Sequence, residues 1–446
     1  IKDEGYEVAN SLRFDDGSSD YLAFTPSSET QRKIATFSAW VKRGLVDGGT
    51  PTIFEIFETS SNQVEIFFDS SERLNVSNRI SNTAHNLVTT AVFRDPSAWY
   101  HIVYSLDTTQ GTASNRQKLY VNGTQVTSFD EAGYMNQNTN SVFGTTNVHH
   151  VGRSQYGFDY FDGYIAELAV IDGTALDPTS FGEFDSDTNI WKPIDVSGLT
   201  FGTNGFYLDF ENSGSLGADV SGNGNNFTVN NLTSIDQSTD TCTNNFTTLN
   251  PLANLTGSPT FSEGNLKVTG DNSANHNWQT TFVVSSGKWY WELKDLTSSP
   301  DGSLLFYDQS IISGSHPGYG FVLNTRKKVI NGSPTGSAIG SSAQNDIWSM
   351  ALDLDNGKMF IARNGTYLES GDPANGTNPF IQTSDGLPSE GVFGGHIYNG
   401  SMELNFGNPS FTISSGNSDG NGYGNFEYAV PSGYYALNTS NLNTYG

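Results

Sequence analysis

A short aromatic stretch contains the first residues that could bind a ligand. Tyr156-Gly-Phe-Asp-Tyr-Phe161 follows the pair His149-His150 and combines four aromatic rings with a carboxylate. Aromatic faces cover the apolar faces of sugars, and carboxylates bond their hydroxyls, so this composition favours glycan contact. We therefore predict a ligand-binding site at Tyr156, Phe158, Tyr160 and His149. The competing interpretation places half of these rings in the core.

The two histidines do not form a metal pair by themselves. If residues 148–152 form a strand, successive side chains point to opposite faces, so His149 and His150 cannot bind one ion together.

A second stretch has the composition of a calcium loop. Asp219, Ser221, Asn223 and Asn225 alternate with residues that include two glycines, which allow a tight wrap. Calcium takes six to eight oxygen ligands, so we predict a calcium site at these four residues. The competing interpretation is an ordinary turn rich in Asp and Asn. Asp15, Asp16 and Asp20 form a weaker acidic cluster.

Glycan hydrolysis needs two placed carboxylates, often as Glu-x-Asp-x-Glu on one strand. The nearest approach is Glu183-Phe-Asp-Ser-Asp187, which lacks the last Glu and stands among loop residues. We interpret it as a solvated acidic loop and predict that the protein is not an enzyme.

Composition excludes several classes of partner. The chain has 446 residues, a formal net charge of −26 and only 21 Lys plus Arg. Nucleic acids and anionic membranes are bound through clustered cations, so neither is expected. No apolar run is long enough to insert into a membrane. Salt or divalent cations relieve the self-repulsion of an acidic surface, which favours a marine or extracellular setting. The sequence begins at Ile1 rather than Met, which leaves an upstream segment open.

Short strands must position these candidates. In residues 348–354 apolar and polar side chains alternate, then Asn356-Gly357 turns the chain into the apolar run 359–362. Residues 100–123 repeat this hairpin pattern with a longer loop. The chain also exceeds the length at which one core stops growing. We predict one domain over 1–229, an Asn/Thr/Ser-rich linker over 230–259 and a second domain over 260–446.

The order of strand patterns in the first domain resembles a laminin-G-like, concanavalin-type jelly roll. The resemblance rests on Phe37-Ser-Ala-Trp-Val, Trp99-Tyr-His-Ile-Val, Leu119-Tyr-Val-Asn-Gly and Phe161-Asp-Gly-Tyr-Ile-Ala-Glu-Leu. Members often have Asp-Glu where this chain has Ala166-Glu167. The resemblance implies a β-sandwich with loops at its rim.

The second domain resembles a SPRY domain. The resemblance rests on Gly287-Lys-Trp-Tyr-Trp-Glu-Leu and on residues 346–365. It implies a second two-sheet sandwich that binds a partner through loops. The expected fold class is therefore all-β, with two concanavalin-like antiparallel β-sandwich domains in tandem.

This pairing of domains, with its Asn/Gly/Thr-rich style, is similar to virion proteins of marine bacteriophages. It implies a non-enzymatic fibre or receptor-binding component that recognises surface glycans or a host receptor and contacts other virion proteins, as a homo-oligomer. Two alternatives stay open: a structural virion decoration protein and a glycan hydrolase of concanavalin-like fold.

Overall fold

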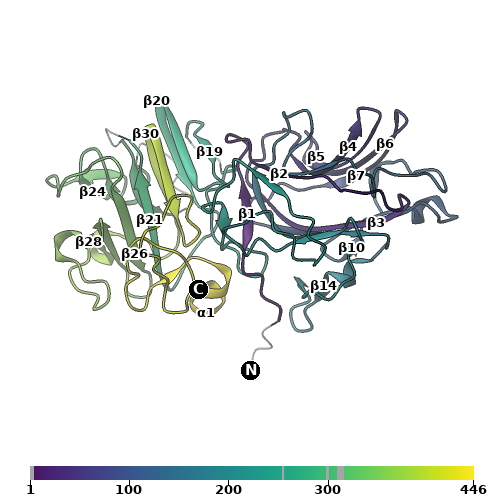
Figure 1. The fold of residues 1–446 in the computed structure, drawn as a ribbon. Helices are drawn as coiled ribbons and strands as arrows, with labels where there is room; N and C mark the ends of the chain where they lie inside the picture. The colour runs from purple at the N-terminus through teal and green to yellow at the C-terminus, as the bar shows by residue number, and fades with distance from the viewer. Residues whose placement is uncertain (1–4, 254–255, 298–300, 309–315) are drawn as a thin grey trace. The chain divides into compact units, whose positions relative to one another are not determined.

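The computed structural model describes residues 5–253, 256–297, 301–308 and 316–446 (Figure 1). The chain divides into two compact units, Ile1–Thr243 and Asn244–Gly446, called here the N-terminal and C-terminal units. Both are built mainly of β-strands. The prediction of an all-β fold of two antiparallel sandwich domains in tandem is confirmed.

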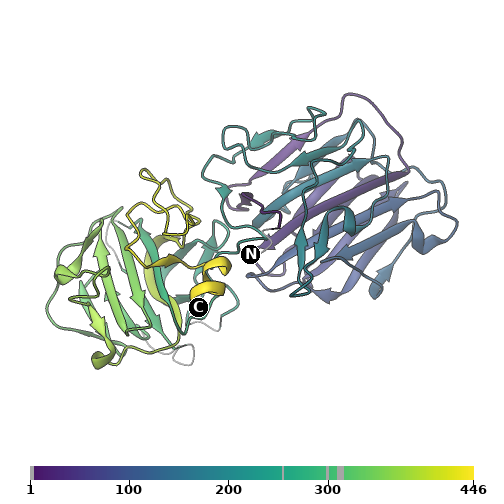
Figure 2. The same ribbon diagram turned by 90° about the horizontal axis from the view of Figure 1, so that it is seen from below.

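Two eight-stranded antiparallel sheets and a hairpin build the N-terminal unit (Figures 1 and 2). The first sheet has the order β10 (Thr124–Gln125), β9 (Gln117–Val121), β8 (Trp99–Asp107), β3 (Ile34–Arg43), β13 (Gly163–Asp172), β1 (Ser11–Phe14) and β18 (Gln237–Ser238), with β16 (Phe206–Leu208) added to β13. The second sheet has the order β11 (Phe129–Ala132), β7 (Thr83–Val92), β6 (Arg73–Ile80), β5 (Asn62–Phe68), β4 (Thr52–Thr59), β12 (Val148–Val151), β2 (Tyr21–Phe24) and β17 (Thr228–Asn230). The hairpin is β14 (Gly182–Phe184) with β15 (Trp191–Pro193), and two 3-10 turns are η1 (Ala113–Asn115) and η2 (Pro178–Ser180).

The inner faces of the two sheets share one hydrophobic core. Phe37, Ala39 and Val41 alternate along β3 and are fully buried, as their period-two spacing predicts. The Phe37 ring lies 5.2 Å from that of Phe54 on β4, so aromatic side chains of the two sheets meet. This Phe-rich packing fixes the strands whose ends carry the candidate site.

The outward face of the first sheet is covered as well. The hairpin β14–β15 places the ring of Trp191 beside that of His101 on β8. On its other side the His101 ring stacks on Trp40, with ring centroids 4.8 Å apart. Trp191 Nε1 donates to His101 Nδ1 at 2.9 Å, and burial lowers the pKa of His101 to about 3. A side chain at Gly123 would clash with Trp191, which explains a glycine there.

The boundary between the units differs from the linker expected over 230–259. β17 and β18 belong to the N-terminal unit, and the residues between and after them carry the acidic partners of two buried cations. Lys42 pairs with Asp240 at 2.7 Å, and Arg13 pairs with Asp236 at 3.1 Å. This stretch follows the surface of the N-terminal unit and forms hydrogen bonds through short polar side chains, so it is rich in Asn, Thr and Ser. A linker has the same composition, and composition alone therefore could not distinguish the two.

In the described part of the C-terminal unit, thirteen strands are joined in one hydrogen-bonded arrangement, with a short helix at its end. The strands are β19 (Thr260–Ser262), β20 (Lys267–Gln279), β21 (Lys288–Asp295), β22 (Ser303–Tyr307), β23 (Tyr319–Val322), β24 (Lys327–Ile330), β25 (Ser333–Thr335), β26 (Ile347–Asp353), β27 (Lys358–Arg363), β28 (Thr366–Tyr367), β29 (Ile381–Gln382), β30 (Val392–Asn405) and β31 (Tyr435–Ala436). The helix α1 spans Thr439–Tyr445, and η3 (Leu368–Ser370) and η4 (Thr383–Asp385) are 3-10 turns.

The predicted hairpin in this unit is confirmed as β26 and β27, and its second turn uses Asn364 and Gly365 at positive φ. The last segment packs back on the strands, since β31 pairs with β21. Buried Glu292 anchors this return by accepting the backbone N–H groups of Glu427 and Tyr428 at 3.0 and 2.8 Å. The tail is therefore part of the domain.

Within the described ranges, α1 and the other helices are too short and too polar to cross a bilayer.

Candidate functional site

The predicted aromatic residues lie in the connection between β12 and β13. Phe158 is 87% exposed and Tyr156 is 54% exposed, whereas Tyr160 is half-buried and Phe161 is fully buried against Phe14. The Arg153 guanidinium lies 5.8 Å from the Tyr160 ring centroid and restricts that ring. The stretch therefore contains both solvent-facing rings and buried rings. The competing interpretation placed half of the rings in the core.

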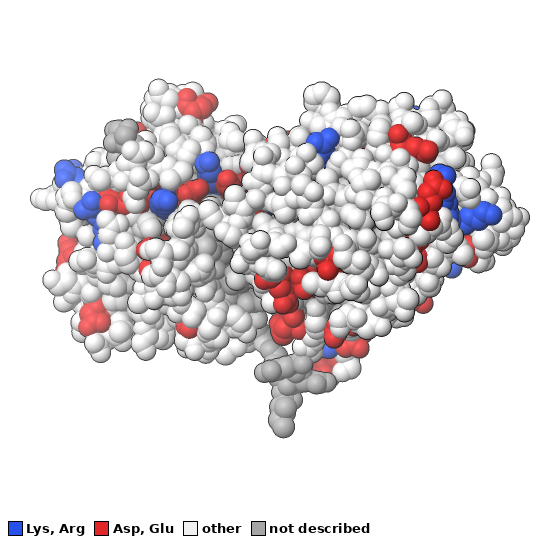
Figure 3. All heavy atoms as spheres, viewed as in Figure 1, with Lys and Arg blue, Asp and Glu red and all other residues white. Residues whose placement is uncertain are grey.

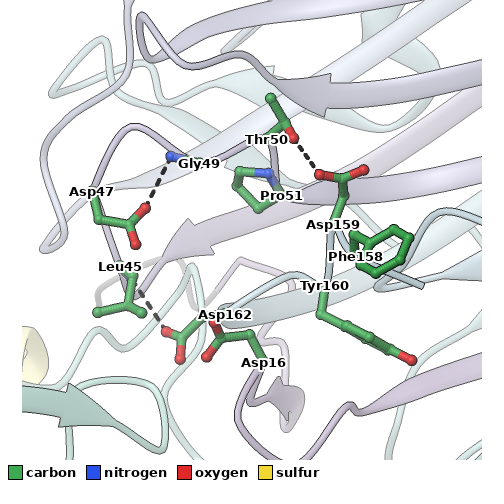
Figure 4. A pocket seen from close by; sticks show the side chains of 10 residues that line it. All are labelled: Asp16, Leu45, Asp47, Gly49, Thr50, Pro51, Phe158, Asp159, Tyr160 and Asp162. Carbon is green, nitrogen blue, oxygen red and sulfur yellow. Dashed lines mark hydrogen bonds between the residues drawn. The ribbon is translucent and has the colours of Figure 1, made fainter. Parts of the chain in front are cut away.

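A pocket of about 190 Å³ lies beside these rings (Figure 4). Two connections, the one after β3 and the one before β13, form most of it, and Asp16 comes from the connection after β1. Its lining comprises Asp16, Leu45, Asp47, Gly49, Thr50, Pro51, Phe158, Asp159, Tyr160 and Asp162. Thr50 donates to Asp159, and the Leu45 N–H donates to Asp162 Oδ1 at 3.2 Å, so hydrogen bonds hold the two connections together.

Three carboxylates converge at one end of this pocket. Asp15, Asp16 and Asp162 each place an oxygen within 4.8 Å of the others. Burial and the neighbouring charge of Asp15 raise the pKa of Asp16. The sequence grouped Asp20 with Asp15 and Asp16; its Oδ2 instead accepts the Asp15 N–H at 3.0 Å. Carboxylate oxygens of this kind suit hard cations such as calcium.

Sequence reasoning missed Asp162, because it is distant from Asp15 and Asp16 along the chain. The available signal was its position before Gly163, whose φ of 139° starts β13 next to β1. Only the pairing of β1 with β13 brings the three carboxylates together, and strand pairing is not readable from local pattern.

His149 does not reach the pocket. Its side chain points into the core, 2% exposed, among the rings of Phe24, Phe54 and Phe206. Burial lowers its pKa to about 4, and Nδ1 contacts the Asn147 carbonyl at 3.0 Å. The structure therefore assigns His149 to packing and separates it from the predicted ligand residues.

A pair of acidic residues on adjacent strands supports the connection that contains the aromatic stretch. Glu55 of β4 lies directly opposite Glu65 of β5, and His150 of β12 lies on its other side. Glu55 Oε2 accepts the Gln155 N–H at 2.6 Å, which fixes the start of the aromatic stretch. Burial, with the charges of Glu55 and Asp159, raises the pKa of Glu65 to about 7.

Alternation along residues 62–68 could have placed Glu65 on the outward face of its strand. The register that sets it beside Glu55 could not be read from the sequence, because it depends on how the two strands pair.

The predicted calcium loop is tightly bonded within itself. The Asp219 carboxylate accepts three backbone N–H groups, those of Tyr207, Ser221 and Asn225, at 2.8 to 3.0 Å. The amides of Asn223 and Asn225 donate to carbonyls of the 202–205 turn. The four predicted residues do come together, but their polar groups stabilise the turn that follows β16.

The acidic stretch weighed as a hydrolase motif forms the hairpin β14–β15. Lys192 lies 3.3 Å from both Glu183 and Asp185. Asp185 also accepts the N–H groups of Asp187 and Thr188, at 3.0 and 2.9 Å, which lowers its pKa to about 2. These carboxylates close a surface turn, as the solvated-loop interpretation expects.

Comparison with known proteins identifies the fold around the pocket. Residues 16–180 match the profile of the Concanavalin A-like lectin/glucanases superfamily, in its laminin-G form. These residues form a laminin-G-like, concanavalin A-type domain, and they contain every residue that lines the pocket. No curated protein matches the sequence.

Solved structures give weaker likenesses. The laminin α1 chain of mouse, domains LG4-5, is 10% identical over 89% of this chain and 84% of its own, with a TM-score of 0.32. The SPRY domain of human HERC1 is 12% identical over 35% of this chain and 96% of its own, with a TM-score of 0.29. Domain 4 of the arabinanase AbnA from Geobacillus stearothermophilus, solved with arabinotriose, is 21% identical over 34% and 65%, with a TM-score of 0.27.

Proposed function

We propose that the protein is a non-enzymatic surface protein whose N-terminal unit binds a glycan at the pocket beside Phe158. The observation that carries this proposal is an aromatic ring 87% exposed to solvent at the edge of a pocket lined by carboxylates. An exposed aromatic face next to several carboxylate acceptors offers the two kinds of contact that a sugar uses.

The chemistry of the lining supports a sugar. Phe158 and Tyr160 offer faces for the C–H side of a sugar ring, and Asp16, Asp47 and Asp159 offer acceptors for its hydroxyls. No Lys or Arg lines this pocket, within the part of the chain that is described. A neutral glycan therefore fits better than a sulfated or carboxylated one, which the aspartates would repel.

Calcium belongs to this proposal as a second ligand. Asp15 and Asp16, from the weaker predicted cluster, come together with Asp162 beside the glycan pocket. The other predicted group, at Asp219, lies in a loop whose carboxylate accepts three N–H groups. A cation among the three aspartates would also reduce their mutual repulsion.

The setting is proposed from sequence resemblance and composition. We place the protein on a virion, as a phage fibre or receptor-binding component, or on another extracellular surface. Most of the face visible in Figure 3 is uncharged, with acidic side chains in separate patches. Single sugar contacts are weak, so several copies acting together in a homo-oligomer would supply avidity, while the SPRY-like unit would hold a neighbouring virion protein.

The test is glycan-array binding of the full chain and of two variants. We expect Phe158→Ala to reduce binding about tenfold, the loss of one stacking contact of roughly 1.4 kcal/mol. Ile190→Ala, which shortens an apolar side chain 65% exposed on the hairpin β14–β15, is the matched control. Equal binding by wild type and Phe158→Ala would remove the pocket from the proposal.

Glu55 and Glu65 make hydrolysis a second candidate, because two facing carboxyls with one raised pKa are what glycosidases use. Against it, Glu55 is 1% exposed and already accepts the Gln155 N–H. We expect no new reducing ends from β-glucan, agarose or alginate. Turnover that disappears in Glu65→Gln would establish the hydrolase instead.

A further inference from the structure

A second pocket, of about 300 Å³, opens on the outward side of the first sheet of the N-terminal unit. It lies at the end of β8 and the start of β9, under the connection that follows β13. Its lining comprises Ser105, Asp107, Gln110, Asn115, Lys118, Tyr120, Ala175, Leu176 and Asp177. It shares no residue with the pocket beside Phe158.

The walls of this pocket are fixed by local turns. Asp107 accepts the Thr109 N–H at 3.0 Å and the Gln110 amide at 2.6 Å. Asp177 caps η2 by accepting the Thr179 N–H at 2.9 Å. Each aspartate is thereby held in place before any ligand arrives, which lowers the entropic cost of binding.

Three other side chains of the pocket bring further polar atoms to it. Among the residues that the structure describes, Lys118 Nζ, Tyr120 Oη and Ser105 Oγ form no side-chain hydrogen bond or ion pair, although all three face the same space. Burial and the charge of Asp177 raise the pKa of Tyr120, so its hydroxyl stays a donor. Convergent polar groups in a pre-formed pocket are the usual mark of a binding site.

We propose that this pocket binds one neutral sugar residue of a glycan. Lys118, Tyr120 and Ser105 supply donors, Asp177 supplies acceptor oxygens, and Leu176 with the Tyr120 ring supplies apolar surface. One ammonium and two carboxylates leave the lining with one net negative charge, so an anionic sugar would be repelled. A volume of about 300 Å³ is at the small end of ligand pockets and suits a single ring.

This inference goes beyond the function proposed above, since it makes the N-terminal unit bivalent. Ile34 at one end of β3 pairs with Asp107, while the other end of β3 leads into the connection that lines the Phe158 pocket. A ten-residue strand spans roughly 30 Å at ~3.3 Å per residue, so one monosaccharide cannot fill both sites.

Saturation-transfer NMR on the full chain tests the proposal, with methyl glycosides of glucose, galactose, mannose and xylose as neutral probes and methyl glucuronide as the anionic one. We expect at least one neutral glycoside to receive saturation that falls about tenfold in Lys118→Met, because a hydrogen bond to a charged group is lost. Tyr120→Phe, which keeps the ring, should weaken the signal less. Lys327→Met, a half-buried lysine of the C-terminal unit, is the matched control.

The proposals for the two pockets can be contradicted independently of each other. Signal that survives Phe158→Ala and is lost in Lys118→Met supports the second site, whatever the outcome at the first. No neutral glycoside signal sensitive to Lys118→Met, or a signal as strong for methyl glucuronide, overturns the second site and leaves the proposal for the Phe158 pocket intact.

Discussion

At the scale of single residues, Asp219 shows how one composition can serve two purposes. Its spacing with Ser221, Asn223 and Asn225 suits a calcium loop, and the same short polar side chains suit an Asx-type turn. In the structure the carboxylate accepts three N–H groups, and the two amides bond carbonyls. A cation there would have to replace donors that are already in place.

We therefore expect Asp219→Ala to destabilise the N-terminal unit by roughly 2–4 kcal/mol with or without calcium, since several charge-assisted hydrogen bonds are lost. Urea denaturation in calcium and in chelator measures this. An Asp219→Ala effect seen only in calcium would restore the loop as a metal site.

Calcium binding beside the Phe158 pocket is tested in the same way, by comparing stability in calcium with stability in chelator. A ligand that binds only the folded state stabilises it, by about 2.7 kcal/mol at a hundredfold excess over its dissociation constant. We expect calcium to raise the melting temperature of the full chain and Asp16→Asn to remove that shift. A shift that persists in Asp16→Asn and vanishes in Asp219→Ala would move the ion to the other loop.

At the scale of elements, adjacent strands create groups that no single strand contains. β4 and β5 join Glu55 to Glu65, and β1 beside β13 joins Asp15 and Asp16 to Asp162. Period-two patterns in the sequence identified the strands and the inward face of β3. The acidic pairs could not be predicted, because register and sheet order depend on contacts between distant segments.

Glu65 should make stability depend on pH. Its pKa is raised from 4.5 to about 7 in the fold, so between these values the folded chain binds more protons than the unfolded chain. Stability then falls as pH rises from about 4.5 to 7, by up to about 3 kcal/mol, and is level above that range.

Calorimetry across that pH range measures the effect. We expect Glu65→Gln to flatten the slope, while Glu58→Gln on the neighbouring strand β4 leaves it unchanged. Glu167, whose pKa burial also raises to about 7, contributes a remaining slope of the same sign. An unchanged slope in Glu65→Gln would mean that the carboxyl stays ionised in the fold.

At the scale of the whole molecule, two domains could be foreseen from length and from two separate hairpin patterns. The position of the boundary could not. Residues 230–243 look like a linker because they are polar and aperiodic, yet Asp236 and Asp240 are the acidic partners of buried Arg13 and Lys42. Pairing across more than 190 residues leaves no trace in local composition.

We expect a fragment ending at Thr243 to melt cooperatively and one ending at Asn230 to be unfolded. The shorter fragment removes both acidic partners and leaves two cations in a dry interior, a penalty of about 3–5 kcal/mol for each pair. Circular dichroism of the two fragments compares them directly. Cooperative melting of the shorter fragment would show that the return segment is dispensable.

The pairing of β1 with β18 also decides how the N-terminal unit responds to pulling. Ser11 lies opposite Ser238, so the chain enters and leaves this strand pair at the same end. Tension between residues 8 and 243 would peel the strands apart one hydrogen bond after another instead of shearing them together. Before the strands part, the load meets the 3.1 Å bond from the Val8 N–H to Thr243 Oγ1 and then the buried Lys42–Asp240 ion pair. The bond between Val8 and Thr243 is thus the first mechanical barrier to unfolding from this end, and Asp240 supplies the second.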